Sequence, residues 1–250
     1  MGERYDFRTK RLYVDEDLAA DKEIEADRAQ SNYLLNVLRL KAGNPILLFN
    51  GRDGEWLADI QPTGRKACQL VPRKQLRPQP APYDLMLCFA PLKQARLDYM
   101  VQKAVEMGAG FLQPVITRYT QVQKLNNERM QANLLEAAEQ CGILSVPVMG
   151  EPVALEAMLD NWLSNHPDRV LIFCDELVEG SDDLAGLQSL SGRKLAVLIG
   201  PEGGFAEEER DLLRAKPFVH ALSLGPRILR ADTAAVAAMA IVQAFIGDYR

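Results

Sequence analysis

Two loops in the last quarter of the chain carry the residues whose types and spacing could do chemistry. The first is Gly200-Pro201-Glu202-Gly203-Gly204, which follows the apolar run 195–199 and precedes the acidic segment 206–210. The apolar run predicts a buried strand, and the acidic segment predicts the first turn of a helix. A glycine-rich turn at the carboxyl end of a buried strand is where open α/β sheets bind ligands.

The second loop, residues 224–230, follows a predicted strand at 219–223 and precedes an apolar helix at 233–246. It is mainly apolar but projects Arg227 and Arg230. These cations either pair with surface carboxylates or meet an anionic partner such as RNA phosphates. Because both loops end strands of one predicted sheet, we expect them to form one composite site.

The composition of the first loop narrows the choice of ligand. It lacks the Gly-Lys-Ser/Thr ending of a nucleotide-hydrolysing loop and the GxGxxG spacing of a dinucleotide turn. Glu202 would repel a pyrophosphate, but it suits a ribose hydroxyl or a positive charge. S-adenosylmethionine carries both, and the glycines would let the backbone approach its adenine. The alternative is a tight strand–helix turn with a solvated Glu202.

Strands and helices alternate from Asp84 onward, which predicts a largely parallel sheet covered by helices. The last helix is apolar almost all round, which favours a subunit interface as its second partner. Asp232, just before the alanine-rich segment, is expected to cap that helix. Residues 1–75 instead predict a small β-rich barrel with one helix at 31–40, and residues 72–83, with four prolines, predict a linker.

Composition excludes several other classes of protein. The 250 residues are 48% apolar and 25% charged, as in ordinary globular proteins, and a net charge of −5 argues against a surface that binds nucleic acid throughout. No secretory signal and no apolar run long enough to span a membrane is seen. The four cysteines are expected to be buried free thiols of a cytoplasmic protein, and two histidines make a metal site improbable.

Together the two loops resemble the signature pair of the ribosomal RNA small subunit methyltransferase E family. The matching stretches are Leu-Ile-Gly-Pro-Glu-Gly-Gly-Phe at 198–205 and Leu-Gly-Pro-Arg-Ile-Leu-Arg-Ala-Asp-Thr-Ala at 224–234. Four further segments resemble the N-terminal barrel and two catalytic-domain helices of the family: 34–43, 49–51, 102–108 and 136–142. Two residues depart from its pattern, since Asp232 replaces a usual Glu and Ile143 a common Arg.

The resemblance implies a fold and a reaction. The family belongs to the SPOUT class of S-adenosylmethionine-dependent RNA methyltransferases, whose parallel sheet carries helices on both faces and a trefoil knot. We therefore expect a SPOUT domain at 84–250 and a PUA-like β-barrel for RNA recognition at 1–75. The implied reaction is methylation of uridine N3 in 16S-type ribosomal RNA. Its substrate would be the small subunit (the 30S particle) or a precursor, and the enzyme would be a cytoplasmic homodimer without a metal.

For this implied reaction we hypothesise roles for individual residues. Arg230, or Arg227, would stabilise negative charge on the uracil, and Glu202, Asp232 or a water molecule would accept the N3 proton. Arg11, Arg39 and Lys93 are either RNA contacts or ordinary surface charges. The cofactor would be held by residues of both loops and of the strands that precede them: Leu198, Ile199, Gly200, Glu202, Gly203, Leu222, Ser223, Leu224, Gly225, Ile228 and Leu229.

Three other functions remain open from the sequence. A SPOUT enzyme acting on transfer RNA or on a ribose 2′-oxygen would share the fold. A non-enzymatic RNA-binding dimer would use the barrel as its reader and the α/β half as a dimerisation platform. A Rossmann-type oxidoreductase is least favoured, because its fingerprint is absent.

Overall fold

The structure is a computed structural model that describes residues 8–64, 66–175 and 183–247. The chain divides into two compact units. The first contains Met1–Pro82 together with Ala138–Val146, and the second contains Tyr83–Ala137 and Pro147–Arg250. The first unit thus includes a short segment from the middle of the chain, which the sequence had placed in the C-terminal domain.

The first unit is built on a five-stranded sheet with the order β1-β3-β4-β5-β2. The β1–β3 pair is parallel and the other pairs are antiparallel. The sequence predicts four of these strands, at 12–14, 45–49, 55–60 and 68–71, and the structure confirms them, with the last two longer than expected. The two-residue β2 is too short to show a pattern in the sequence. Their bounds are β1 Arg11–Tyr13, β2 Ile24–Glu25, β3 Pro45–Phe49, β4 Glu55–Gly64 and β5 Ala67–Arg77.

The core of this unit follows the two-residue period of its strands. Alternate side chains of β3, β4 and β5 point to one side, where they meet the buried Leu34. The buried members of this cluster are Leu12, Val14, Leu18, Ile24, Leu34, Ile46, Leu48, Ala58, Ile60, Cys68 and Leu70.

Residues 72–77 of the expected linker belong to β5 instead. Pro72 is accommodated because the ladder to β4 shifts register next to its partner Ala58, so the missing N–H breaks no regular pairing. The carbonyl of Pro72 still accepts from the amide of Asp21 at 2.8 Å. Only residues 78–84 lie outside regular structure here.

The helix of the first unit begins earlier than expected and changes type. It starts as α1 (Arg28–Asn32) and continues as the π-helical η1 (Tyr33–Val37). Asp27 and Gln30 form a reciprocal capping box, a signal in the sequence that would have placed its start correctly. After the helix, Arg39 has a left-handed backbone with φ 55°.

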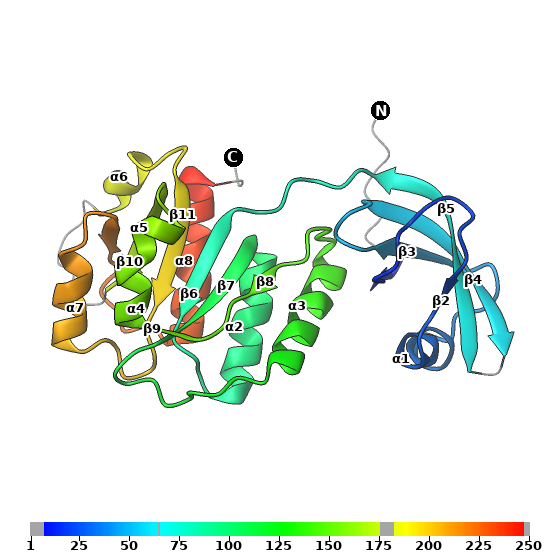
Figure 1. The fold of residues 1–250 in the computed structure, drawn as a ribbon, viewed down its shortest axis with the longest axis horizontal. Coiled ribbons are helices and arrows are strands. Elements are labelled where there is room, and N and C mark those ends of the chain that lie inside the picture. Colours follow the sequence, from blue (N-terminus) through cyan, green and yellow to red (C-terminus); the bar gives the residue numbers. More distant parts are fainter. Residues whose placement is uncertain (1–7, 65, 176–182, 248–250) are drawn as a thin grey trace. The chain divides into compact units, whose positions relative to one another are not determined.

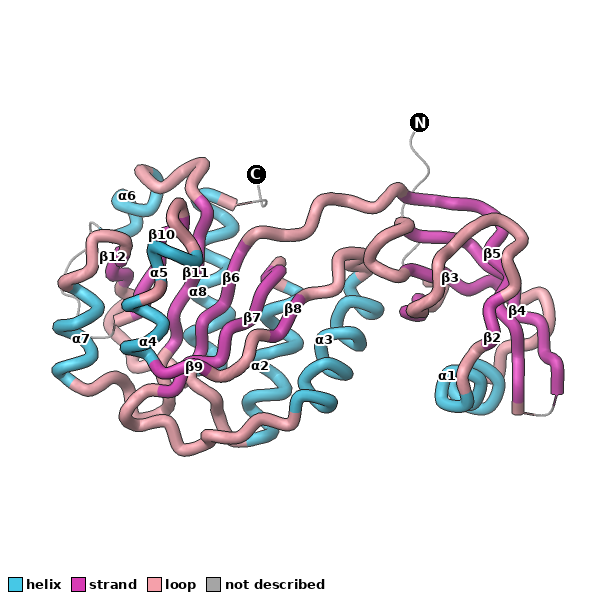
Figure 2. Tube along the Cα trace, in the orientation of Figure 1, coloured by secondary structure: helices cyan, strands magenta, loops and turns pink. Residues whose placement is uncertain are grey.

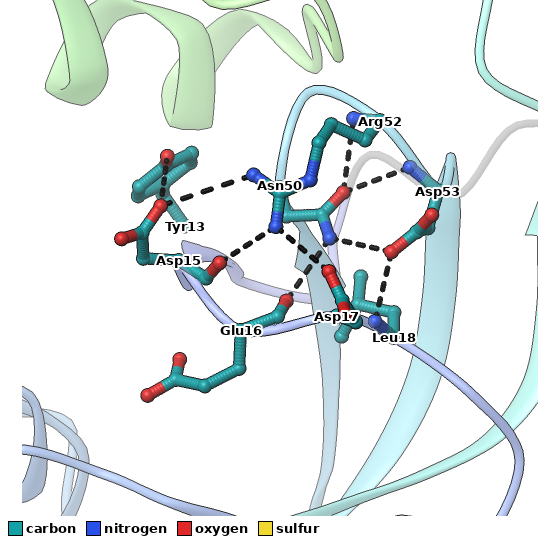
Figure 3. A network of polar contacts seen from close by, with 8 residues as sticks. All are labelled: Tyr13, Asp15, Glu16, Asp17, Leu18, Asn50, Arg52 and Asp53. Atoms are coloured by element: carbon teal, nitrogen blue, oxygen red, sulfur yellow. Dashed lines mark hydrogen bonds and ion pairs between the residues drawn. The ribbon is translucent and has the colours of Figure 1, made fainter.

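A polar network joins the loop at residues 15–18 to the turn at 50–53 (Figure 3). The side-chain amide of Asn50 donates to the carbonyl of Glu16 at 3.0 Å and to Asp53 at 2.7 Å. Its oxygen accepts from the amides of Arg52 and Asp53. The hydrogen bond from the Leu18 amide, and next that from Asn50, lowers the pKa of Asp53. The Asn50-Gly51 turn is therefore held by its own side chains.

The second unit contains a parallel sheet, as predicted, and the order of its strands is β12-β10-β11-β6-β7-β8 (Figure 2). A further short strand, β9, pairs with the far end of β7. The bounds are β6 Leu85–Phe89, β7 Ala109–Ile116, β8 Val148–Met149, β9 Val153–Ala154, β10 Arg169–Cys174, β11 Lys194–Ile199 and β12 Val219–Leu222.

Helices cover both faces of this sheet. α2 (Gln94–Glu106) and α8 (Ala231–Ile246) pack against each other and lie behind the sheet in Figure 1. α4 (Leu155–Asp160), α5 (Trp162–Asn165) and α7 (Glu207–Arg214) supply the core of the opposite face. The remaining helices are α3 (Asn127–Cys141) and α6 (Asp183–Gln188).

Two expectations about individual side chains are wrong. An apolar stripe predicts one helix over residues 155–163, but this helix breaks at Asn161, which leaves Leu163 53% exposed. Among the free cysteines, Cys68 and Cys88 are buried as expected, but Cys141 is exposed and Cys174 is half-buried. Within the part of the chain that the structure describes, every helix is too short or too polar to cross a bilayer.

Candidate active site

A cavity of about 420 Å³ opens where β10, β11 and β12 end. Because β10 lies between β11 and β12, the loops that follow these outer two strands stand on either side of the end of β10. This volume lies within the range of small-molecule sites. Its lining residues are Arg96, Cys174, Asp175, Ile199 to Phe205, Arg210, Leu224, Gly225, Arg227 to Ala231 and Ala234.

The first loop is shaped by close packing at its glycines. A Cβ on Gly200 would lie 2.6 Å from the ring of Phe205, and a Cβ on Gly203 would lie 3.1 Å from the Cβ of Tyr119. The Phe205 ring is in turn fixed edge-on against Phe173 of β10, with 5.1 Å between centroids. Side chains at these glycines would therefore displace the wall of the pocket.

The second loop is loosely packed, in contrast to the first. Gly225 has φ +95° and no atom within 4 Å of where a Cβ would stand, so its backbone is accessible. Ile228 is 87% exposed, and the side chain of Arg230 is 61% exposed. Arg227 is also exposed. This loop therefore presents an apolar side chain and two cations to the solvent at the pocket.

Arg230, not Asp232, is the residue at the N-cap of α8. Asp232 lies in the first turn, where its Oδ1 accepts from the amide of Thr233 at 3.1 Å and lies 3.7 Å from Nε of Arg230. The expectation that Asp232 caps the helix is wrong because the helix begins one residue before it. Its charge still faces the positive end of the helix dipole.

A buried ion-pair network supports the floor of the pocket. Asp175, 3% exposed, follows β10 and accepts from Nη1 of Arg210 at 2.9 Å and from Nη2 of Arg214 at 2.5 Å. Nε of Arg210 also donates to the carbonyl of Phe205 at 3.1 Å. The backbone amide of Asp175 donates to the carbonyl of Leu222 at 3.1 Å. The network thereby ties both loops to the end of β10.

Glu202 faces Arg96 from α2 across the pocket. Nη1 of Arg96 lies 3.5 Å from Oε1 of Glu202, and both side chains remain partly exposed. At this distance and exposure the pair is weak, so the carboxylate remains available to a ligand.

Most of the expected cofactor residues line the cavity, and so do all three expected catalytic residues. Ser223 is not among its lining residues. Leu198 and Leu222 are also outside the lining, because their side chains are fully buried in the sheet.

The three expected RNA contacts differ in their surroundings. Arg11 is 7% exposed, and its Nε donates to Glu55 at 2.8 Å. Glu55 is itself bonded twice by Arg77, so Arg11 belongs to a buried ion-pair cluster and is not free to bind RNA. Arg39 and Lys93 are exposed.

Nine residues that line the pocket received no cofactor or catalytic role from the sequence: Arg96, Cys174, Asp175, Pro201, Gly204, Phe205, Arg210, Ala231 and Ala234. A signal existed for Asp175, because the apolar run 170–174 directly before it predicts another buried strand, whose end reaches the same edge of the sheet. Burial raises the pKa of the Cys174 thiol to about 12, so the thiol is neutral near pH 7. The described residues contain no cluster suited to a metal ion.

Comparison with known proteins identifies the family. A family model for an RNA methyltransferase domain matches residues 79–243, and one for an RNA methyltransferase PUA domain matches residues 26–73. The ribosomal RNA small subunit methyltransferase E of Rickettsia conorii is 33% identical over 234 residues, which cover 93% of this chain and 94% of that protein. The chain belongs to the ribosomal RNA small subunit methyltransferase E family.

Solved structures agree with this family assignment. A ribosomal RNA small subunit methyltransferase E from Neisseria gonorrhoeae, bound to S-adenosyl methionine, has a TM-score of 0.81 at 26% identity and covers 97% of this chain and 100% of its own. A methyltransferase from Legionella pneumophila with bound cofactor SAM has a TM-score of 0.81 at 28% identity, with 95% and 98% covered. The expected family, the α/β fold and the PUA-like N-terminal domain are confirmed.

Proposed function

We propose that this chain transfers a methyl group from S-adenosylmethionine to N3 of a uridine in 16S-type ribosomal RNA of the small subunit or its precursor. The observation that carries the proposal is that both signature loops line the same cavity. Its support comes from the family, whose members are named for small-subunit ribosomal RNA, and from two similar structures that hold this cofactor.

The chemistry of the pocket fits the cofactor. Glu202 offers a carboxylate to a ribose hydroxyl or an ammonium group, and the exposed backbone at Gly225 offers close approach to an adenine edge. Ile199, Leu224 and Leu229 supply apolar surface for the adenine ring. The carboxylate at the centre of the loop disfavours a pyrophosphate-bearing cofactor.

When bound, S-adenosylmethionine supplies an electrophilic methyl group. The residues of the chain then have to orient the uracil and manage its charge. Loss of the N3 proton leaves negative charge on O2 and O4 of the uracil, and the guanidinium of Arg230 or Arg227 would donate hydrogen bonds there. Both side chains are exposed at the pocket and able to reach a substrate.

The proton on N3 needs an acceptor, and Glu202 is our candidate. Two carboxylates line the cavity among the described residues, Glu202 and Asp175. Asp175 is bonded to two arginines and buried, whereas Glu202 has only its weak contact with Arg96. A water molecule is the alternative acceptor.

The complete enzyme would act as a cytoplasmic homodimer on the ribosomal particle. On the free chain, α8 leaves several apolar side chains half-buried, among them Val236, Ile241 and Phe245. A second subunit would cover them. Arg39 in the PUA-like unit and Lys93 at the start of α2 would contact RNA phosphates.

The test is incubation of the protein with labelled S-adenosylmethionine and undermethylated small subunits, followed by nucleoside analysis. We expect label in 3-methyluridine. Label in a ribose 2′-O-methyl group, or only in transfer RNA, would contradict the proposed position or substrate. Absence of cofactor binding in calorimetry would instead support the non-enzymatic RNA-binding alternative.

A further inference from the structure

A tight turn beside the first signature loop presents an exposed aromatic ring. The turn spans residues 117–120 and follows β7. Tyr119 at its tip is 47% exposed, yet its Cβ packs against Gly203 so closely that a Cβ there would lie 3.1 Å away. The stem of this tyrosine is therefore fixed against the pocket wall while its ring faces solvent.

Buried hydrogen bonds hold the turn in place. The Thr117 amide donates to Oγ1 of Thr120 at 2.9 Å, the two hydroxyls lie 2.9 Å apart, and the Thr120 amide donates to the carbonyl of Thr117 at 3.1 Å. Both threonines are buried. A turn whose polar groups are bonded internally is a rigid support for the side chains at its tip.

Glu209 of α7 links this turn to the first loop. Its Oε1 accepts from the amide of Arg118 at 2.8 Å, and its Oε2 accepts from the amide of Ala206 at 2.9 Å. One carboxylate thus holds the turn and the end of the pocket loop at a fixed separation. These two hydrogen bonds fix the position of Tyr119 relative to the pocket.

The chemistry around the ring is that of a nucleic-acid contact. An open hollow beside it is lined by Arg118, Tyr119, Thr120, Gln121 and Gly203. Arg118 and Gln121 are exposed and carry a cation and an amide. An aromatic face next to a guanidinium is the combination that binds single-stranded RNA, because the ring stacks on a base while the cation meets a phosphate.

We propose that Tyr119 is the stacking platform for a nucleobase that neighbours the target uridine, with Arg118 at the adjoining phosphate. This contact would keep the target strand splayed at the mouth of the pocket. The identity of the RNA rests on the proposed function. The stacking contact itself concerns only RNA binding, because Tyr119 would not touch the methyl group.

The test compares Tyr119→Ala, Tyr119→Leu and Tyr119→Phe with Tyr99→Ala. Tyr99 is a matched control, since it is an exposed tyrosine of the same unit, 46% exposed, on α2. Two quantities are measured with undermethylated small subunits: direct binding by co-sedimentation, and the subunit concentration that gives half-maximal methylation. Cofactor affinity is measured by calorimetry.

We expect the alanine and leucine variants to weaken subunit binding roughly tenfold, as for the loss of one base–aromatic stack. Phe should keep nearly full binding, and Tyr99→Ala and cofactor affinity should be unchanged. Leucine retains the packing of the stem on Gly203, so its loss of binding reports the ring. Subunit binding by Tyr119→Leu equal to wild type, an equal loss in Tyr99→Ala, or a matching loss of cofactor affinity would each overturn the inference.

Failure of the proposed function would look different. Wild-type protein that binds subunits but transfers no methyl group would refute the proposed reaction, while the binding measurements would still decide the role of Tyr119. Normal methylation by wild type with unaltered binding in Tyr119→Leu would refute the stacking role alone.

Discussion

Four arginines line the pocket, and their surroundings separate the structural ones from those able to meet a substrate. Arg210 is buried and forms an ion pair with Asp175, and Arg96 lies near Glu202. Arg230 is largely exposed and only 3.7 Å from Asp232, a distance beyond a hydrogen bond. Arg230 can therefore turn toward a bound uracil without breaking a strong contact.

Replacing Arg230 with Ala should lower turnover by roughly 10²–10³-fold, the range for removal of one donor to a developing oxyanion. Because its contacts in the protein are weak, cofactor affinity should hardly change. Single-turnover methylation and calorimetry measure the two quantities separately. Arg227→Ala provides the comparison between the two candidates. Unchanged turnover in Arg230→Ala would remove it from the chemistry, and lost cofactor binding would make it part of the cofactor site.

Gly225 offers a test of the backbone approach to the cofactor. Its φ of +95° disfavours any other residue, and Ala should cost about 1 kcal/mol in strain. Gly192 is a matched control, because it has φ +81° and equally open space but is not among the residues that line the pocket. We expect both Ala variants to lose similar stability in thermal unfolding, and only Gly225→Ala to weaken cofactor binding. Equal cofactor affinity in the two variants would contradict an adenine-binding role for this backbone.

Among the elements, the end of β10 connects the two sides of the pocket, which the sequence did not predict. Asp175 is the meeting point of two residues one turn apart on α7, and its amide is bonded to Leu222 at the end of β12. The two basic residues differ in burial: the side chain of Arg210 is 7% exposed and that of Arg214 is 40% exposed. The buried Arg210–Asp175 pair should therefore contribute more to stability than the partly exposed Arg214–Asp175 pair.

We expect Arg210→Ala to destabilise the protein by about 3 kcal/mol, because it leaves a buried carboxylate with one partner. Arg214→Ala should cost less than about 1 kcal/mol, as for a partly exposed pair. Denaturant unfolding measures both. Since Arg210 also holds the Phe205 carbonyl, its variant should weaken cofactor binding as well. Similar losses of stability in the two variants would show that burial does not set the strength of this network.

The sequence predicted elements better than it predicted their ends. Short apolar runs in the sequence mark every strand of the parallel sheet except the two-residue β8 and β9. An apolar stripe of helical spacing from Leu97 to Val105 marks the buried face of α2. Boundaries failed where a side chain overrides the pattern, as at Asp27, whose capping box starts α1 early, or at Pro72, which a register shift admits into β5.

The pocket itself could be predicted only in part. The two glycine-rich loops are local in sequence, so their spacing was visible. Arg96 reaches the pocket, and Tyr119 packs on Gly203 beside it, from elements more than eighty residues away in the chain, so their proximity depends on the strand order. The basic type of Arg11 suggested an RNA contact, but its pairing with Glu55 requires knowledge of which strands are neighbours.

At the scale of the whole molecule, each unit is assembled from two separate stretches of chain. Within the first unit, Nη2 of Arg77 donates to the carbonyl of Gly142 at 3.0 Å, and the Tyr13 amide donates to Glu139 at 2.9 Å. Ile143 and Leu144 are buried. Residues 138–146 are thus a constituent of the PUA-like unit rather than a loop attached to it.

A cut at residues 121–126, which have no regular structure, should leave the protein intact in solution. Each fragment would supply part of both units, so the two should stay together by burial of their shared cores. A protease site placed there, followed by gel filtration with and without denaturant, measures this. We expect co-elution in buffer and separation in urea. Fragments that separate in buffer would contradict the expectation that both units are held together across the cut.

The interleaved chain also sets an order of events during synthesis. When Pro82 has been added, the nascent chain still lacks the segment that ends at Val146, so the PUA-like unit must wait for 146 − 82 = 64 more residues. At about 5–20 residues per second this delay is roughly 3–13 s. Over that interval the apolar surface destined for Ile143 and Leu144 stays uncovered, and residues 83–137 of the second unit are synthesised before the first unit has all its parts.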